Sequence, residues 1–366
     1  MKNLQLISSE CLGVGHYPCA DTLSKDGKFR LEVGGPKSFI LSSDDFLKTY
    51  KTESFAENAP HFTYGFTELS DGTFISLEVN NQVHNKYIIK EGSPQFVLGI
   101  RRADSFEDIM AGKIKTSFCI VDIPDLTFGF GDCGNSHSGT VAQGLIQLEN
   151  GDIIATMYGQ RTTDTTLCPY FDTERGYKFY LYSAWCIISR DGGKTFEYLS
   201  DLADVQTYPI PDVNAEGYCE PDILDLGGGH LVSVIRTGGH EVYSPLYCTH
   251  SYDSGKTWGA PYEILSWGVY PRLMKMKDGT VALLSGHIHT FIMLSDDGGI
   301  TWSEPHIIEE CDGKWDKSTS GYGAFFEDDC GNICVIFDDP KEGIAENAPP
   351  YHLRRVYLRK YKLSEE

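Results

Sequence analysis

One eight-residue motif decides the fold of this chain, and its first copy reads Ser189-Arg190-Asp191-Gly192-Gly193-Lys194-Thr195-Phe196. Two further copies cover 251–258 and 295–302, and all three follow the pattern S-x-D-x-G-x-T-(W/F) after a short apolar run. A pattern that returns along a chain predicts a repeated structural unit. The residue types suit a hairpin corner, because Asp accepts hydrogen bonds from nearby backbone N–H groups and Gly adopts positive φ.

A second repeat consists of short Gly-containing turns between apolar runs, which are strong hairpin signals. These turns lie at 25–27, 70–72, 149–151, 227–229, 277–279 and 329–332. Six turns predict six blades of four strands each. The approximate blade bounds are 12–52, 58–122, 134–205, 216–266, 267–310 and 318–363. The first blade carries a degenerate motif at 43–50, and unrelated hairpins in a β-sandwich are the alternative.

The motif is similar to the Asp-box, or BNR repeat, of sialidase-type β-propellers, and the chain resembles a divergent member of that superfamily over most of its length. The resemblance implies an all-β, six-bladed β-propeller that forms a single domain over 1–366, with the Asp-boxes on outer turns away from the site. The charge-rich end at 354–363 alternates like a strand. We expect it to pair near the N-terminus, with most of its basic residues facing solvent.

Composition limits the possible partners and the compartment. The net charge of −21 argues against nucleic acid or an anionic membrane as partner, since both need basic patches. The chain contains no apolar run of roughly 18 residues, the length of a membrane-spanning helix. The stretch at 1–10 is too short and too polar for a signal peptide. Eleven scattered cysteines without C-x-x-C indicate buried free thiols. We therefore expect a cytoplasmic protein without a cofactor, or a secreted one if a leader has been removed.

The predicted fourth blade resembles the sialidase pattern most closely. Sialidases carry a Glu in the first strand of this blade and an Arg at the end of the second strand. Glu220 and Arg236 match these positions, at 236 − 220 = 16 residues apart across a hairpin. A carboxylate and a guanidinium on neighbouring strands offset each other's burial. A structural ion pair is the alternative interpretation.

The predicted sixth blade opens with Ser320-Gly321-Tyr322, where sialidases place a nucleophilic tyrosine. The resemblance implies that Tyr322 attacks the sugar, as sialidases do in place of a second carboxylate. A phenol has a pKa near 10, so a neighbouring base must take its proton, and Glu220 would be that base. In the third blade, His137 could contact the substrate or transfer a proton.

The chain departs from the sialidase pattern elsewhere. Sialidases bind the substrate carboxylate with three arginines and protonate the leaving group with an Asp. The first arginine is missing at 15–20, the third at 284–290, and the acid/base Asp is missing too. Either Arg161, Arg236 and Arg272 rebuild the carboxylate site, or the substrate is not a typical sialic acid.

Two other groups of residues remain candidates. Asp132 and His137 are candidates for the acid/base group. His287 and His289, at i and i+2 on a predicted strand, would share one face and could bind substrate. They lack a third ligand, so we expect no metal.

These observations predict an exo-glycoside hydrolase that removes a terminal sugar, sialic acid or another sugar that could be acidic, from a glycan or oligosaccharide. Tyr322 and Glu220 are its predicted catalytic residues. The predicted substrate-binding residues are Arg236, Arg272, His137, Arg161, His287 and His289. The alternatives are a non-catalytic propeller that binds glycans or proteins, and a lyase or neutral-sugar hydrolase on the same scaffold.

Overall fold

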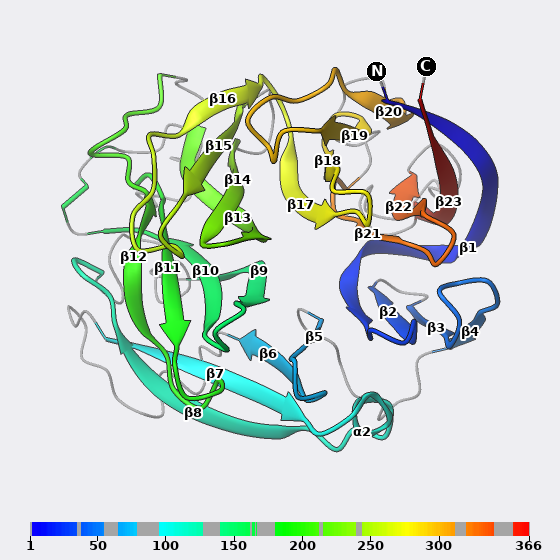
Figure 1. Cartoon of the computed structure of the whole chain (residues 1–366), viewed down its shortest axis with the longest axis horizontal. Coiled ribbons are helices and arrows are strands. Elements are labelled where there is room, and N and C mark those ends of the chain that lie inside the picture. The colour runs from blue at the N-terminus through cyan, green and yellow to red at the C-terminus, as the bar shows by residue number, and fades with distance from the viewer. Residues whose placement is uncertain are drawn as a thin grey trace, which may run out of the picture. The chain divides into compact units, whose positions relative to one another are not determined.

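The computed structural model is almost entirely β-structure. It describes residues 2–34, 38–54, 65–78, 95–126, 140–161, 163–164, 166, 180–211, 215–238, 244–311, 320–339 and 354–365. Within these ranges the one α-helix is α2 (Phe106–Met110; Figure 1). It begins at Ser105, whose side chain accepts a hydrogen bond from the backbone N–H of Asp108.

The chain divides into two compact units, which we describe one at a time. The first consists of Met1–Phe74, Ala103–Ile114 and Arg272–Glu366, and the second of Ile75–Arg102 and Lys115–Pro271. The single six-bladed domain expected from the sequence therefore stays a prediction.

The first unit contains a seven-stranded sheet of order β21-β22-β23-β1-β2-β3-β4 and a four-stranded sheet of order β17-β18-β19-β20. Its strands are β1 (Lys2–Leu23), β2 (Phe29–Gly34), β3 (Phe39–Ser43), β4 (Lys51–Ser54), β5 (Thr67–Glu68), β17 (Val269–Lys275, from Arg272 onward), β18 (Val281–Gly286), β19 (Thr290–Ser295), β20 (His306–Glu309), β21 (Ala324–Glu327), β22 (Asn332–Asp339) and β23 (Arg354–Glu365).

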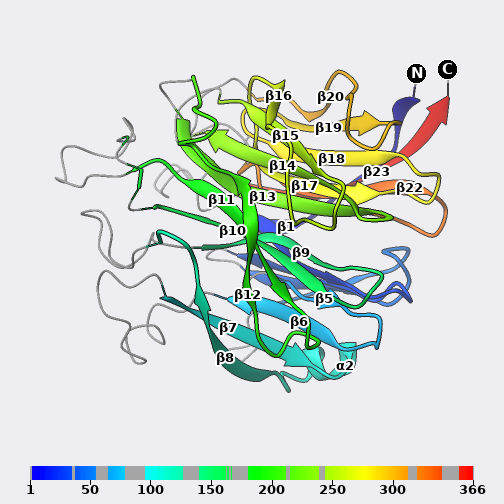
Figure 2. The same ribbon diagram turned by 60° about the vertical axis from the view of Figure 1, so that its left-hand side comes forward.

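The second unit contains four-stranded sheets of order β12-β11-β10-β9 and β13-β14-β15-β16, and β6, β7 and β8 in that order (Figure 2). Its strands are β6 (Phe74–Glu78, from Ile75 onward), β7 (Gln95–Ala103, up to Arg102), β8 (Lys115–Asp122), β9 (Thr140–Gln147), β10 (Ile153–Gly159), β11 (Ser183–Ser189), β12 (Glu197–Ala203), β13 (Ala215–Gly227), β14 (His230–Gly238), β15 (Leu246–Ser251) and β16 (Tyr262–Leu265).

The long strand β1 takes part in two antiparallel meanders of the first unit. Its first half pairs with β23, from Lys2↔Glu365 to Gly15↔Arg354, and its second half pairs with β2 (Figure 1). The predicted pairing of the C-terminal strand near the N-terminus is therefore confirmed. Among its basic residues, which we expected mostly to face solvent, Arg354 is an exception: it is 4% exposed and pairs with the buried carboxylate of Asp338 at 3.3 Å.

The two sequence repeats occupy two different kinds of turn. Each of the six predicted Gly turns joins the first two strands of a meander, and their glycines have positive φ, such as 88° at Gly27 and 92° at Gly151. The three Asp-boxes join the third and fourth strands, at β11–β12, β15–β16 and β19–β20. Both placements confirm that the motifs close hairpins.

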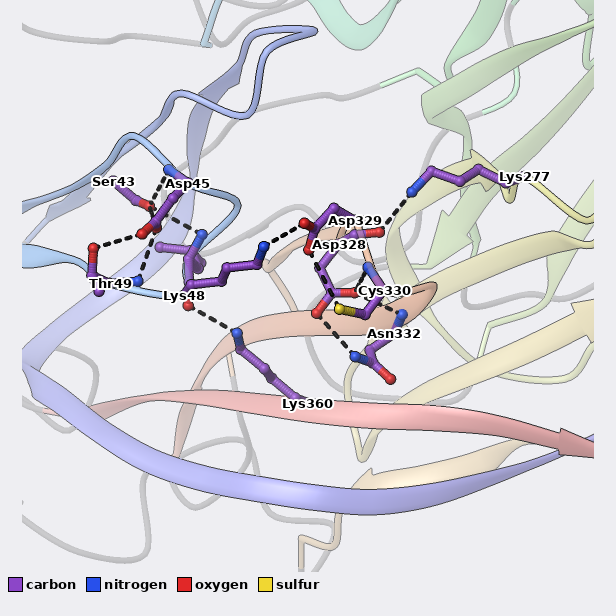
Figure 3. A network of polar contacts seen from close by, with 11 residues as sticks. Ser43, Asp45, Lys48, Thr49, Lys277, Asp328, Asp329, Cys330, Asn332 and Lys360 are labelled. Atoms are coloured by element: carbon purple, nitrogen blue, oxygen red, sulfur yellow. Dashed lines mark hydrogen bonds and ion pairs between the residues drawn. The ribbon is translucent and has the colours of Figure 1, made fainter.

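The Asp-box corner is held by the side chains that define the motif. In the first copy, Asp191 accepts hydrogen bonds from the backbone N–H of Thr195 at 3.0 Å, from its hydroxyl at 2.7 Å and from the hydroxyl of Ser189 at 2.8 Å. The degenerate box at 43–50 keeps this geometry, with Asp45 bonded to Thr49 and Ser43 (Figure 3). Its Leu47 occupies the Gly position at a φ of 55°.

The middle strands of the sheets form the core. All residues of β11, β15, β18 and β19 are buried, whereas β4 at a sheet edge is fully exposed. Among the described side chains that are fully buried, Trp185 of β11 is the largest. A strand whose side chains are buried in both directions must be covered on both faces of its sheet, which explains the continuous apolar runs in the sequence.

Two expectations from composition can be compared with the described residues. Nine of the cysteines lie there, none forms a disulfide, and five are buried, namely Cys186, Cys219, Cys248, Cys311 and Cys334. The thiols are free as predicted, but the predicted burial does not hold for the other four, Cys11, Cys19, Cys119 and Cys330. No helix in the described ranges combines the length and hydrophobicity needed to cross a membrane.

Candidate functional site

The second unit brings Glu220 and Arg236 together. The hairpin of β13 and β14 places Arg236 opposite Cys219, and the Arg236 guanidinium lies 2.8 Å from the Glu220 carboxylate. Their side chains are only 11% and 13% exposed. An ion pair this well shielded from water is strong, and removing one partner destabilises the fold because it leaves the other charge buried and unpaired.

A second carboxylate, from Glu216, joins this ion pair. Its oxygen lies 3.7 Å from the guanidinium, and its side chain is 9% exposed. Burial raises the pKa of Glu216, the charge of Arg236 opposes that rise, and the charge of Glu220 adds to it. The cluster therefore contains two carboxyl groups around one cation, and one of them has a raised proton affinity.

The backbone around the cluster is unusual. Glu220 has a φ of 46° and precedes Pro221, at an irregularity of pairing between Cys219 and Asp222. An irregularity of this kind turns a side chain away from the direction that regular strand alternation would give it, and such irregularities are common next to active sites. The strained backbone at Glu220 therefore sets the direction of its side chain.

Gly217 holds Glu216 in place by a close backbone approach. Tyr182 donates its N–H to the Glu216 carbonyl at 2.8 Å, and Tyr218 donates to the Tyr182 carbonyl at 2.8 Å. A Cβ on Gly217 would lie 2.1 Å from the backbone nitrogen of Tyr182. Only glycine fits there, so this residue fixes the path of the strand that carries both carboxylates.

Gln143 of β9 also holds this segment through hydrogen bonds to backbone carbonyls. Its Nε2 donates to the carbonyl of Glu220 and to that of Pro271, both at 2.9 Å. Thr156 adds a hydroxyl bond of 2.7 Å to the carbonyl of Pro221. The first strands β9 and β13 and the start of β17 are thus tied together within the second unit beside Glu220.

Tyr158 of β10 is a functional candidate that the sequence did not single out. Burial raises the pKa of its phenol well above 10, and the nearby charge of Glu220 raises it further. Its ring packs edge-on against Tyr182 at 5.2 Å. The only sequence signal was its place next to Gln160 and Arg161 at a strand end.

Two of the other predicted arginines are paired with carboxylates. Arg161 is 5% exposed, binds Asp201 through two nitrogens, one of them at 3.0 Å, and lies over the ring of Trp185 at 5.4 Å. In the first unit, Arg272 contacts Asp21 at 3.2 Å. Their roles in substrate binding stay predictions.

The remaining predicted residues have the following places. Tyr322, in the first unit, packs its ring edge-on against Tyr17 at 5.0 Å. His287 and His289 lie in the turn between β18 and β19, and the His289 ring accepts a hydrogen bond from the N–H of Cys311 at 3.0 Å.

The predicted strand across the two histidines is therefore wrong. The reason is the end of β18 at Gly286, which approaches Gly321 so closely that a Cβ would lie 2.2 Å from its Cα. His137 and Asp132 lie outside the described residues. The sharing of one pocket by Tyr322 and Glu220, which belong to different units, is untested.

One group of metal-ligand type occurs among the described residues, formed by Asp328, Asp329 and Cys330 in the β21–β22 turn. The Asp328 carboxylate accepts bonds from the backbone N–H groups of Cys330 and Asn332, both at 2.9 Å, and Asp329 pairs with Lys48 (Figure 3). These bonds serve the turn, so we assign no metal to it.

The sequence and the fold were compared with known proteins. The family model for the BNR repeat-like domain matches residues 133–335, more than half of the chain. The chain therefore belongs to the family of BNR repeat-like domains, and its described residues have an all-β fold apart from one short helix. No curated protein sequence matches it significantly.

Three solved structures illustrate the similarity of fold. A protein of unknown function from Dyadobacter fermentans has a TM-score of 0.60 at 15% identity, over 97% of this chain and 99% of that one. The NanB sialidase from Streptococcus pneumoniae has 0.55 at 14%, over 99% and 70%. The GH93 α-L-arabinofuranosidase of Fusarium graminearum, solved with arabinobiose, has 0.57 at 12%, over 96% and 97%. At these identities the comparison establishes the fold alone.

Proposed function

We propose that the protein is a glycoside hydrolase that removes a terminal sugar from a glycan, with Glu220 in the catalytic machinery. The observation that carries the proposal is the strained presentation of Glu220, at a φ of 46° before a proline, beside Arg236 and Glu216. Backbone strain of this kind persists where function requires it. The fold shared with a sialidase and an arabinofuranosidase supports the same class of reaction.

Glu216 is our proposal for the acid/base group that the sequence did not identify. A general acid must keep its proton at the working pH, and burial raises the pKa of this carboxyl. It would donate the proton to the leaving oxygen as the bond to the anomeric carbon breaks. Tyr322, if it reaches the anomeric carbon, would be the nucleophile and Glu220 the base that takes the phenol proton.

The test is a panel of nitrophenyl α-sialosides, uronides and neutral glycosides, together with unactivated disaccharides of the same sugars. Glu220→Gln should reduce turnover of activated and unactivated substrates alike. Glu216→Gln should reduce turnover of the disaccharides far more, because a nitrophenolate leaves without a proton. Equal losses on both substrate types in Glu216→Gln would reject its role as the acid, and a wild type inert on the whole panel would reject the hydrolase.

A second candidate, a non-catalytic glycan-binding protein, is favoured by one observation. Arg236 forms an ion pair with Glu220, is approached by Glu216, and donates its Nε to the Gly238 carbonyl at 2.8 Å, so the cluster could serve as a rigid wall. In that case a glycan array would give binding that Arg236→Ala abolishes, and no glycoside would be turned over.

We also propose that the sheets form one six-bladed ring, as the six turn signals and the sharing of β1 by two meanders suggest. A compact chain of 366 residues has a radius of gyration of about 21 Å. Small-angle X-ray scattering should return about this value, and a clearly larger radius would contradict a closed ring.

A further inference from the structure

Within the part of the chain that the structure describes, three strands share one backbone feature, a residue of positive φ directly before a proline, which we call the step. Tyr17 in β1, Glu220 in β13 and Tyr270 in β17 have φ values of 51°, 46° and 46°, and each directly precedes a proline. In each of these strands the step comes before the Gly-containing turn that leads to the second strand of the meander. The step is therefore a structural repeat, although its residue changes from Tyr to Glu to Tyr.

This step is unfavourable for the residues that adopt it. A residue before proline normally has a φ near −120°, because the proline ring crowds its backbone. Positive φ is costly for any side chain with a Cβ and is found where the surroundings enforce it, often at binding and catalytic sites. Since one of the three steps presents the Glu220 carboxylate, the other two call for an equivalent explanation.

Tyr17 is rigidly held yet open to solvent. Its N–H donates to Asp338 at 3.1 Å, and this fully buried carboxylate also accepts from the N–H of Ser320 at 2.6 Å and contacts Arg354 at 3.3 Å. Tyr17 is 39% exposed as a residue, and its ring packs edge-on against Tyr322 at 5.0 Å with an interplanar angle of 79°. An aromatic ring that is held in place and partly exposed can pack against the apolar face of a ligand's ring.

Tyr270 is fixed in the second unit by the same clamp as Glu220. The Gln143 side chain donates to the carbonyl of Glu220 and to that of Pro271, the residue after Tyr270, both at 2.9 Å. The Gln143 side chain thus links the step of β13 to the step of β17. Tyr270 itself remains partly exposed.

The charges of the predicted substrate-binding arginines point to the kind of sugar. Arg236 contacts Glu220 at 2.8 Å, Arg272 contacts Asp21 at 3.2 Å, and Arg161 binds Asp201. Each of these cations already faces a carboxylate of the protein. A carboxylate on the substrate would have to compete with these partners, whereas a neutral sugar would not.

We propose that Tyr17 and Tyr270 are sugar-binding residues, presented by the same backbone step as Glu220, and that the sugars they bind are neutral. The proposal rests on the proposed action on glycans and specifies its substrate class. Each tyrosine ring would cover the C–H face of a sugar ring, and its hydroxyl is not required for that contact.

The experiment measures binding of lactose, arabinobiose and sialyllactose to the whole protein by isothermal titration calorimetry, alongside thermal stability. Phe and Gly are substituted in turn at Tyr17 and Tyr270. Tyr252→Gly is the control, because Tyr252 is 67% exposed and stacked on His230 but does not lie at a step. Lactose and sialyllactose differ only in the acidic sugar, so this pair isolates the effect of charge.

We expect a neutral saccharide to bind to the wild type, the Gly variants at 17 and 270 to bind about tenfold more weakly or worse, and the Phe variants to stay within about threefold. Tyr252→Gly should bind normally. Glycine relieves the positive φ, so Tyr17→Gly should keep or raise the melting temperature while binding falls. A purely structural tyrosine would make stability and binding fall together.

The proposal is overturned if the Gly variants bind as tightly as the wild type, if binding requires the sialic acid, or if no saccharide binds. Its failure can be told apart from failure of the hydrolase proposal. Turnover of a glycoside with unchanged affinity in the Gly variants would overturn only the roles of the tyrosines. Tyrosine-dependent binding without turnover of any glycoside would overturn only the hydrolase.

Discussion

Arg236→Met tests how the carboxylate cluster of the second unit is held together. The guanidinium lies between Glu220 and Glu216, and the three side chains are between 9% and 13% exposed. Methionine keeps much of the side-chain length but leaves two buried carboxyl groups without their cation. Removing one partner of a buried ion pair costs about 3–5 kcal/mol. At about 2.1 cal/mol/K of unfolding entropy per residue over 366 residues, the melting temperature should fall by about 4–7 °C.

The loss should depend on pH in a defined direction. Burial already raises the pKa of Glu216, and Arg236 opposes that rise, so removing Arg236 raises the pKa further. A carboxyl group whose folded pKa exceeds its unfolded value binds more protons in the folded state between those values. Stability then falls as pH rises through that interval. Urea denaturation should therefore show a larger loss for Arg236→Met at about pH 7 than at about pH 5.

The chain offers a matched control in Arg190, which pairs with Glu197 on the surface at 51% and 67% exposure. Arg190→Met should cost about 0–1 kcal/mol, because water screens exposed pairs. Adding Glu216→Gln to Arg236→Met should recover part of the loss at neutral pH. The reasoning is refuted if Arg236→Met costs no more than Arg190→Met, or if neither acid nor the second substitution reduces the loss.

Three further predictions address the turns, the strand path and the nucleophile. Burial raises the pKa of Asp297, but hydrogen bonds from the threonine and serine of its own Asp-box prevail and lower it to about 2. This stabilisation is present above the unfolded pKa of 3.8 and is lost as pH falls toward 2, so Asp297→Asn should flatten stability against pH, measured by urea denaturation, in that interval. Gly217→Ala should cost about 2–4 kcal/mol in urea denaturation, because its Cβ would meet Tyr182, whereas Gly151→Ala, with open space at a φ of 92°, should cost only about 1–2 kcal/mol. If Tyr322 is the nucleophile, Tyr322→Phe should lower turnover by orders of magnitude with little change in melting temperature; full activity in this variant would exclude the tyrosine mechanism.

The hairpins could be predicted from the sequence because their signals are local. An Asp-box fixes its corner with bonds between residues at most four positions apart, such as Asp191 with Thr195. The degenerate box at 43–50 has the same bonds even though Leu47 replaces glycine, since the Ser, Asp and Thr that make the bonds are retained. The ends of strands were less predictable: β18 stops before His287 because Gly286 meets Gly321, a residue distant in the sequence.

The candidate site was predictable only where one hairpin builds it. The spacing of Glu220 and Arg236 across a turn was enough to expect their contact, which the structure places at 2.8 Å. Glu216 lies in the same hairpin but was missed, because the pairing of β13 with β14 is irregular between Ala215 and Cys219 and spacing alone does not show which side chains reach Arg236. Tyr158 was missed because it comes from β10, in another sheet. The positive φ of Glu220 contradicts the usual preference of a residue before proline, so no rule applied to the sequence would have suggested it.

The Asp-boxes and the positive-φ steps before proline differ in what is repeated: the side chains in the first and the backbone conformation in the second. The Asp-boxes keep the side chains and vary little, because those side chains make the bonds that hold the corner. The strained step keeps only its backbone, a positive φ and a proline, while the presented residue changes among Tyr17, Glu220 and Tyr270. The positive φ before proline is unfavourable, and no common side chain at this position makes a stabilising contact in all three strands. A gain in stability therefore does not explain why the conformation is repeated. The exchange is expected if each step presents a different group to a ligand, an acid in one strand and aromatic rings in the two others.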